Sequence, residues 1–87
     1  MANVVMYSSM ICPYCTMAKR LLTDKGVEFQ EINVDGDRDA REEMLARANG
    51  AYTVPQIFVG EQHVGGCDDL YALERAGELD SLLELIR

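Results

Sequence analysis

Apolar residues recur with two different periods along this chain. Short β-branched or aromatic runs at residues 3–7 and 27–34 have the length of strands, and apolar residues at helical spacing lie between Pro13 and Gly26. Proline suits the first turn of a helix because its missing N–H is not needed there, and glycine is common just past a helix end. The chain therefore begins with the predicted order strand, helix, strand.

The second predicted strand is irregular, and a second helix follows it. Apolar residues in the strand change parity between Phe29 and Ile32, so either both faces are covered or the strand contains a bulge. The helix is predicted to end near residues 49–50, with Asp37 or Asp39 as its N-cap. Its apolar face is formed by Ala40, Met44, Leu45 and Ala48.

The second half of the chain has shorter connections. Predicted strands at 56–59 and 62–65 are separated only by residues 60–61, so they form a hairpin and are antiparallel. Asp68 and Asp69 are predicted to cap a third helix. The apolar residues of this helix and of a last one are Leu70, Leu73, Ala76, Leu79, Leu82, Leu83 and Ile86.

These elements predict one α/β domain over residues 1–87. A parallel strand–helix–strand unit joined to a hairpin and a helix gives a four-stranded mixed sheet, of order β-α-β-α-β-β-α plus a C-terminal helix. The crossover helix of a parallel unit packs against the sheet, so helices are expected on both faces. At 87 residues and 48% apolar, the chain can build one core but not two.

Charge and cysteine content narrow the function. Fifteen acidic and eight basic residues give a net charge of −7, which argues against a nucleic-acid binder. The first eighteen residues carry no charge, but polar residues interrupt them and no basic segment precedes them, so neither a signal peptide nor a membrane span is predicted. Three cysteines without a secretion signal favour a reducing compartment, and we expect a cytoplasmic protein.

Cys12 and Cys15 flank Pro13 and Tyr14 where the first strand meets the first helix. Residues three apart on a helix face the same side, so a bridge with Cα atoms about 5.5 Å apart is within reach. The pair can therefore cycle between a dithiol and a disulfide. In a reducing compartment such a pair is catalytic or metal-binding rather than a structural staple.

Cys12 is predicted to be the nucleophile because it lies at the helix N-terminus. The thiolate is the attacking form, and hydrogen bonds from first-turn amides stabilise it more than the helix dipole does. Lys19, on the same helix face, is predicted to be a screened, secondary influence. We expect more thiolate at Cys12 than at Cys15, so that Cys12 forms a mixed disulfide which Cys15 resolves.

Two other uses of the cysteines stay open at this point. They could sit in the core as small hydrophobes. They could also bind zinc, because His63 and Cys67 complete four possible ligands. The spacing between the two pairs is far longer than in small zinc modules, however, and a chain with this apolar content does not need a metal to fold. No metal site is predicted, and His63 is interpreted as a partly exposed strand residue.

Three motifs together carry a family resemblance: the Cys12-Pro13-Tyr14-Cys15 pair, Thr53-Val54-Pro55 before the hairpin, and residues 65–69 at the third helix. In this order and on these elements, the whole chain resembles a bacterial dithiol glutaredoxin. The resemblance implies a thioredoxin fold, glutathione as reductant, no tightly bound cofactor and a monomer. The implied substrates are protein disulfides and glutathione mixed disulfides, with ribonucleotide reductase among the protein partners.

The resemblance also assigns roles to individual residues. Cys12 would be the nucleophile and Cys15 the resolving thiol. Tyr14 would form a wall of the glutathione groove, and Thr53 would border it. Val54 would pair its backbone with the cysteine of glutathione.

The remaining roles fall on the proline and on the start of the third helix. Pro55, expected in the cis form, would hold the groove edge open. Gly66 would let the backbone approach the ligand. The amides of Cys67 and Asp68 and the side chain of Asp69 would hold the γ-glutamyl end, as suits a helix N-terminus binding a carboxylate and an acid binding an ammonium.

One position departs from the family pattern. Related glutaredoxins often carry a lysine three residues before the nucleophile, where it meets the glycine carboxylate of glutathione, and this chain has Ser9 there. Arg41, with Arg38 behind it, is the candidate replacement for that charge.

Two alternative functions use the same cysteines. One is a redoxin reduced by thioredoxin reductase, but such proteins typically carry a tryptophan-containing segment, and this chain has no tryptophan. The other is an iron–sulfur or zinc carrier, which Pro13 and Cys15 oppose because iron–sulfur glutaredoxins usually have a single active-site cysteine followed by glycine.

Overall fold

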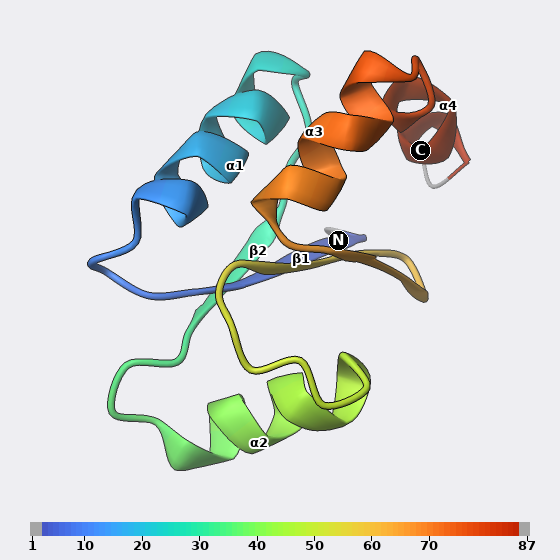
Figure 1. Ribbon diagram of the computed structural model, residues 1–87. Helices are drawn as coiled ribbons and strands as arrows, with labels where there is room; N and C mark the ends of the chain where they lie inside the picture. Colours follow the sequence, from blue (N-terminus) through green and yellow to red (C-terminus); the bar gives the residue numbers. More distant parts are fainter. Residues whose placement is uncertain (1–2, 86–87) are drawn as a thin grey trace.

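A four-stranded sheet with helices on both faces forms the computed structural model, which describes residues 3–85 (Figure 1). The elements follow the predicted order: β1 Val4–Ser8, α1 Pro13–Asp24, β2 Gln30–Asn33, α2 Arg38–Arg47, β3 Gln56–Val59, β4 Gln62–Gly65, α3 Cys67–Arg75 and α4 Leu79–Glu84. The strand order is β2-β1-β3-β4, with β1 parallel to β2 and antiparallel to β3, and β3 antiparallel to β4. The predicted mixed sheet is confirmed.

Alternation along β1 divides the core into two layers. Val4 and Met6 belong to the cluster formed with α1, α3 and α4, whereas Tyr7 belongs to the cluster formed with α2. Figure 1 shows the same division, with α2 alone on one side of the sheet. Burying each large apolar side chain contributes about 1.5 to 3 kcal/mol, so both layers hold β1 in place. The end of β1, where the loop to α1 begins, is fixed by this packing.

β2 is shorter than predicted, and its later start explains the change of parity between Phe29 and Ile32. It begins at Gln30, so Val27 and Phe29 precede the strand and pack against the larger cluster from a loop. The apolar run was longer than the strand because a loop crossing the core edge also needs apolar side chains.

The N-cap prediction for α2 is confirmed at Asp37, whose carboxylate accepts a hydrogen bond from the Ala40 amide at 3.0 Å.

The predicted capping of α3 is confirmed for the Asp69 side chain, but neither Asp68 nor Asp69 is the N-cap residue. The N-cap is Gly66, and both acids lie inside the first turn. Asp69 Oδ2 accepts a hydrogen bond from the Gly66 amide at 3.0 Å, which satisfies a donor just before the helix. Negative charge is favourable anywhere in the first turn, so composition alone did not place the cap. Ile86, predicted in the last helix, lies outside the described residues.

The longest helix between residues 3 and 85 is α1, with 12 residues. Among these described residues, none of the helices is long and apolar enough for a bilayer crossing.

Candidate active site

Cys12 and Cys15 lie at the N-terminus of α1 and form a disulfide. Their Cα atoms are 5.2 Å apart, in agreement with the predicted reach. Cys12 is the N-cap and has an extended backbone with φ −147°, and Cys15 lies one turn further into the helix. Cys12 is partly buried, whereas Cys15 is only 1% exposed. The outer sulfur is therefore the one that another molecule can reach.

The amide of Cys15 donates a hydrogen bond to Cys12 Sγ over 3.1 Å. This is a first-turn amide facing the sulfur, the interaction expected to stabilise negative charge there. Lys19 has another partner, because its ammonium forms an ion pair with Glu31 at 3.0 Å. Ser8 donates a hydrogen bond to the same carboxylate at 2.6 Å. Both contacts lower the pKa of Glu31, and the hydrogen bond from Ser8 has the larger effect.

The loop before β3 faces the sulfur pair. The peptide bond between Val54 and Pro55 is cis, as expected. The carbonyl oxygen of Val54 lies 3.7 Å from Cys12 Sγ, although the two residues are 42 positions apart in sequence. Thr53, the residue before, is exposed. The fold thus places a short stretch of backbone directly beside the nucleophile.

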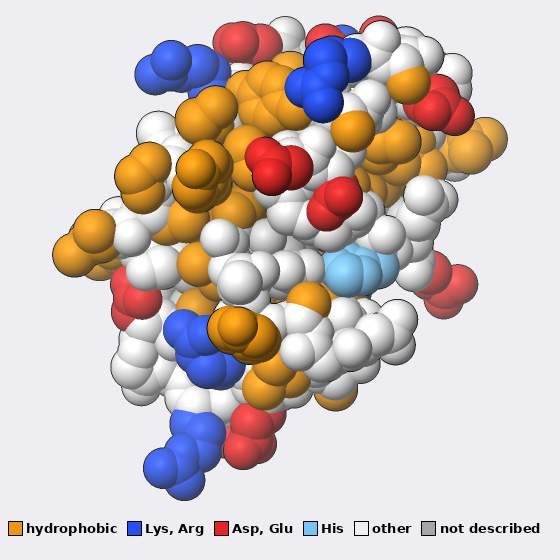
Figure 2. Space-filling model, in the orientation of Figure 1, with side chains coloured by type: hydrophobic (Ala, Val, Ile, Leu, Met, Phe, Trp, Pro, Cys, Tyr) orange, Lys and Arg blue, Asp and Glu red, His pale blue; other side chains and the backbone are white. Residues whose placement is uncertain are grey.

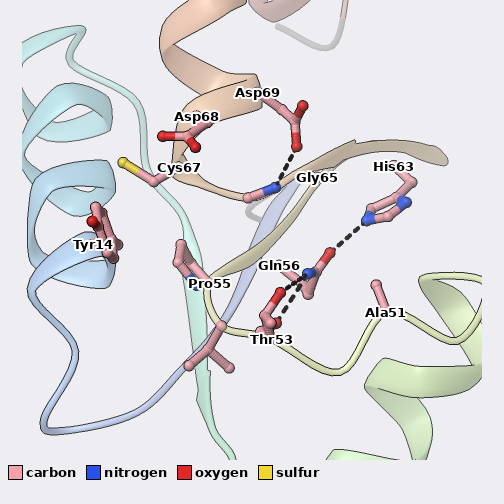
Figure 3. A pocket seen from close by; sticks show the side chains of 12 residues that line it. Tyr14, Ala51, Thr53, Pro55, Gln56, His63, Gly65, Cys67, Asp68 and Asp69 are labelled. Atoms are coloured by element: carbon pink, nitrogen blue, oxygen red, sulfur yellow. Dashed lines mark hydrogen bonds between the residues drawn. The ribbon is translucent and has the colours of Figure 1, made fainter.

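A groove of about 500 Å³ extends from this loop to the start of α3 (Figure 3). Tyr14, which is 59% exposed, stands at one side of it. Cys12 lies next to Val54, one of the lining residues. The groove is lined by Tyr14, Ala51, Thr53, Val54, Pro55, Gln56, His63, Gly65, Gly66, Cys67, Asp68 and Asp69.

The α3 end of the groove combines backbone amides with two carboxylates. The Asp69 carboxylate accepts from the Gly66 amide, and Asp68 is exposed. Cys67 is 6% exposed, and burial, with a smaller contribution from the charge of Asp68, raises the pKa of its thiol. Gly65 has a φ of 115°, and a Cβ there would overlap the Asp69 carboxylate. This close approach requires glycine.

Ser9 and Arg41 lie outside the groove lining. Ser9 donates to Asp35 Oδ1 at 2.7 Å, and the amide of Met10 donates to Asp35 Oδ2 at 2.8 Å. These two hydrogen bonds lower the pKa of Asp35. The bond from the Met10 amide has the larger effect and the bond from the Ser9 hydroxyl the second largest. Arg41 is exposed on α2 and donates to the carbonyl oxygen of Tyr52 at 3.4 Å.

The zinc hypothesis has no support in the geometry. Within residues 3–85, no three His, Cys, Asp or Glu side chains are arranged to hold a metal ion. His63 Nε2 faces Gln56 Oε1 at 2.7 Å, and Cys12 and Cys15 bond to each other. The four proposed ligands do not form one cluster.

Eight of the predicted site residues line the groove together, and four further residues do so without having been predicted. The four are Ala51, Gln56, His63 and Gly65. Gln56 and His63 come together because β3 and β4 pair Phe58 with His63, with a register shift between Ile57 and Phe58. The predicted hairpin already placed Gln56 and His63 on neighbouring strands. The register shift that brings their side chains together did not follow from the sequence.

Comparison with known proteins gives consistent matches. A family model described as glutaredoxin matches residues 4–64. Glutaredoxin of Pseudomonas aeruginosa is 63% identical over 83 residues, covering 95% of this chain and 98% of that protein. Glutaredoxin 3 of Escherichia coli K12 is 58% identical over 84 residues, covering 97% and 100%. The crystal structure of a buckwheat glutaredoxin–glutathione complex has a TM-score of 0.87 at 32% identity, covering 97% of this chain and 78% of that one.

A thioredoxin fold with a C-x-x-C disulfide at the N-terminus of its first helix, beside a cis-proline loop, defines a dithiol redox protein. Among dithiol redox proteins, the matches over nearly the full length identify the family: the chain belongs to the glutaredoxins. It is a glutathione-dependent thiol-disulfide oxidoreductase, with glutathione as co-substrate.

Proposed function

We propose that Cys12 is the nucleophile and Cys15 the resolving thiol. The Cys12 thiolate attacks one sulfur of a substrate disulfide, and the other substrate sulfur leaves as a thiolate. Cys15 then loses its proton and attacks the Cys12 sulfur, which releases the second substrate thiol. The substrate gains two electrons and the protein ends with a Cys12–Cys15 disulfide. Two molecules of glutathione reduce this disulfide and become oxidised glutathione.

The observation that carries these roles is the unequal burial of the two sulfurs. Cys15 is 1% exposed and one helical turn deeper than Cys12, and its amide faces Cys12 Sγ. An external disulfide can approach only the outer sulfur. Cys15 is within bonding reach of Cys12, so it can complete the exchange without a backbone movement.

Glutathione is assigned to the groove with its cysteine beside Val54. Backbone pairing at Val54 places that cysteine near Cys12, since the Val54 carbonyl is 3.7 Å from Cys12 Sγ. Tyr14 covers one side of the bound tripeptide, Thr53 borders it, and Pro55 keeps the edge open.

The γ-glutamyl end is assigned to the N-terminus of α3. Its carboxylate would accept hydrogen bonds from the amides of Cys67 and Asp68, and its ammonium would pair with Asp69. Gly66 allows the close approach, because its backbone lines the groove without a side chain in the way. The Asp69 carboxylate is already oriented by its bond to the Gly66 amide.

Arg41 is assigned to the glycine carboxylate of glutathione. Its hydrogen bond to the Tyr52 carbonyl holds it beside the loop that carries Thr53 and Val54. Ser9 cannot supply a positive charge, and its hydroxyl is bonded to Asp35. An exposed arginine at the groove margin would give a modest contribution to affinity.

Protein substrates are assigned to the apolar surface around the nucleophile. Figure 2 shows hydrophobic side chains gathered over the loop before α1 and over its first turns. The large exposed ones in this part of the chain are Met10, Ile11, Tyr14 and Met17. Disulfide-containing or glutathionylated proteins in the cytoplasm are the proposed partners, with ribonucleotide reductase as the specific candidate to test.

A coupled assay on a small glutathione mixed disulfide tests the roles of the cysteines. Cys12→Ser should abolish all activity. Cys15→Ser should keep removal of glutathione, which needs only the nucleophile and a second glutathione, and should lose reduction of a protein disulfide. Activity in Cys12→Ser, or loss of both activities in Cys15→Ser, would contradict the assignment.

A further inference from the structure

The side chain of Gln56 is nearly sealed from solvent and has a partner at each end. Gln56, the first residue of β3, is 3% exposed. Its Nε2 donates to the carbonyl oxygen of Thr53 at 2.9 Å and to Thr53 Oγ1 at 3.2 Å. Its Oε1 lies 2.7 Å from His63 Nε2. Figure 3 shows these side chains linked in a row, and all three line the groove.

These partners fix the direction of the Gln56 amide. A backbone carbonyl can only accept, so the NH₂ group has to face Thr53 and the amide oxygen has to face His63. That oxygen needs a donor, so the proton of a neutral His63 has to be on Nε2. The His63 ring also stacks on Phe58, with centroids 4.8 Å apart and planes inclined by 24°. The ring is held by a stack and a hydrogen bond together.

The row of hydrogen bonds from His63 through Gln56 ends at the backbone of Thr53, next to the residue that faces Cys12. Thr53 is exposed, and the hydrogen bonds from the buried Gln56 are what tie its carbonyl to the sheet. Val54 follows directly, with its carbonyl oxygen 3.7 Å from Cys12 Sγ. A shift of Thr53 would therefore move the groove edge relative to the reacting sulfur. A displaced edge would offer poorer backbone contacts to glutathione, so substrate binding is the step that these hydrogen bonds affect.

We propose that Gln56 and His63 are positioning residues for glutathione. His63 orients the Gln56 amide, and the amide holds the backbone of Thr53 and Val54 where a glutathione mixed disulfide aligns with Cys12. This inference rests on the proposed binding of glutathione in the groove.

Gln56→Glu removes the donor to Thr53. The variant keeps an acceptor for His63 and loses the NH₂ group. The Michaelis constant for a small glutathione mixed disulfide should rise about tenfold, since two hydrogen bonds that set the binding edge are lost. The turnover number should stay within about twofold, because Cys12 and its helix are untouched. Gln62→Glu makes the same chemical change at an exposed position of the hairpin and should leave both constants unchanged.

Substitutions at His63 test the other end of the row. His63→Phe keeps an aromatic ring against Phe58 but removes the Nε2 proton, so the Michaelis constant should rise in the same way. His63→Gln restores an N–H donor and should recover part of the loss. Nitrogen-15 NMR of the wild type should show the neutral ring protonated on Nε2, a signature that simple packing of the ring does not require.

The outcomes separate this inference from the proposed function. Wild-type Michaelis constants in both Gln56→Glu and His63→Phe, or a neutral His63 ring protonated only on Nδ1, would overturn the inference. Thermal unfolding shows whether each variant is folded, and if Gln56→Glu is not, His63→Phe and the NMR result still decide. A wild-type protein without activity on the mixed disulfide would contradict the proposed function instead.

Discussion

The backbone amide of Cys15 points at the sulfur of Cys12 from 3.1 Å, while the sulfur of Cys15 itself belongs to a residue that is 1% exposed. After reduction, an alkylating reagent should therefore label Cys12 about tenfold faster than Cys15 or more, since exposure and amide contacts both favour the outer sulfur. Mass spectrometry of peptides after short labelling measures the ratio. The same labelling in denaturant should remove the difference, and equal rates in the folded protein would contradict the prediction.

Cys67 should resist labelling in the folded protein. Burial, with a smaller contribution from Asp68, raises the pKa of its thiol, so little thiolate forms near neutral pH. In the oxidised protein, where Cys12 and Cys15 are bonded, total alkylation should be slow and should accelerate on unfolding. Asp68→Asn removes only the smaller cause and should increase the rate slightly. Labelling as fast as that of a free thiol peptide would rule out this protection.

Asp35 should make stability depend on pH in the acid range. Hydrogen bonds from the Met10 amide and the Ser9 hydroxyl lower the pKa of Asp35 in the folded state. A lowered folded pKa contributes stability that is present above the unfolded pKa, near pH 4, and is lost as the pH falls through the folded value. Asp35→Asn should therefore unfold more easily at neutral pH, and its difference from wild type should shrink as the solution is acidified.

Denaturant titrations at several pH values measure this difference. Glu61→Gln, in the exposed hairpin turn, is the control and should follow the wild-type curve. A difference between Asp35→Asn and wild type that grows on acidification would have the wrong sign.

Gly65→Ala should damage both stability and binding. The added Cβ would meet the Asp69 carboxylate at a residue with φ 115°, so Asp69 has to leave the Gly66 amide. Gly77→Ala is the matched control, because Gly77 also has a positive φ, 73°, but no neighbouring atom within 4 Å. The control should lose about 1 to 2 kcal/mol of unfolding free energy, and Gly65→Ala should lose more. Only Gly65→Ala should also raise the Michaelis constant for a glutathione mixed disulfide.

Arg41→Ala should weaken glutathione binding without changing the nucleophile. A solvated ion pair contributes up to about 1 kcal/mol, so the Michaelis constant for the mixed disulfide should rise about two- to fivefold. The alkylation rate of Cys12 should not change. Arg75→Ala removes the same charge from the last turn of α3 and serves as the control. Equal kinetics for Arg41→Ala and the control would remove Arg41 from the binding assignment.

Local patterns were sufficient to predict the elements that position the cysteines. The strand before Cys12, the helix opened by Pro13 and the hairpin all carry short-range signals, namely an apolar run, a proline at the first turn and a two-residue connection. Element ends that depend on tertiary packing were less predictable. β2 starts at Gln30 rather than at Val27, because the preceding apolar residues pack on the core from a loop.

The groove was predictable only where a motif marked it. Residues such as Tyr14 and Asp69 stand inside recognisable motifs, whereas Gln56 and His63 meet across two strands whose register shifts. The partnership of Ser9 and Met10 with Asp35 joins two loops at the ends of neighbouring strands. Contacts of this kind follow from the folded arrangement, and no spacing in the sequence indicates them.

The two outer strands of the sheet have a consequence for behaviour at high concentration. Both are four residues long, β2 exposes Gln30, Glu31 and Asn33, and the pairing of β4 with β3 is irregular. Short, polar and irregular edges are poor templates for the addition of a further strand from another molecule. The protein can thus keep an open cleft and reactive sulfur at its surface while its sheet borders resist aggregation.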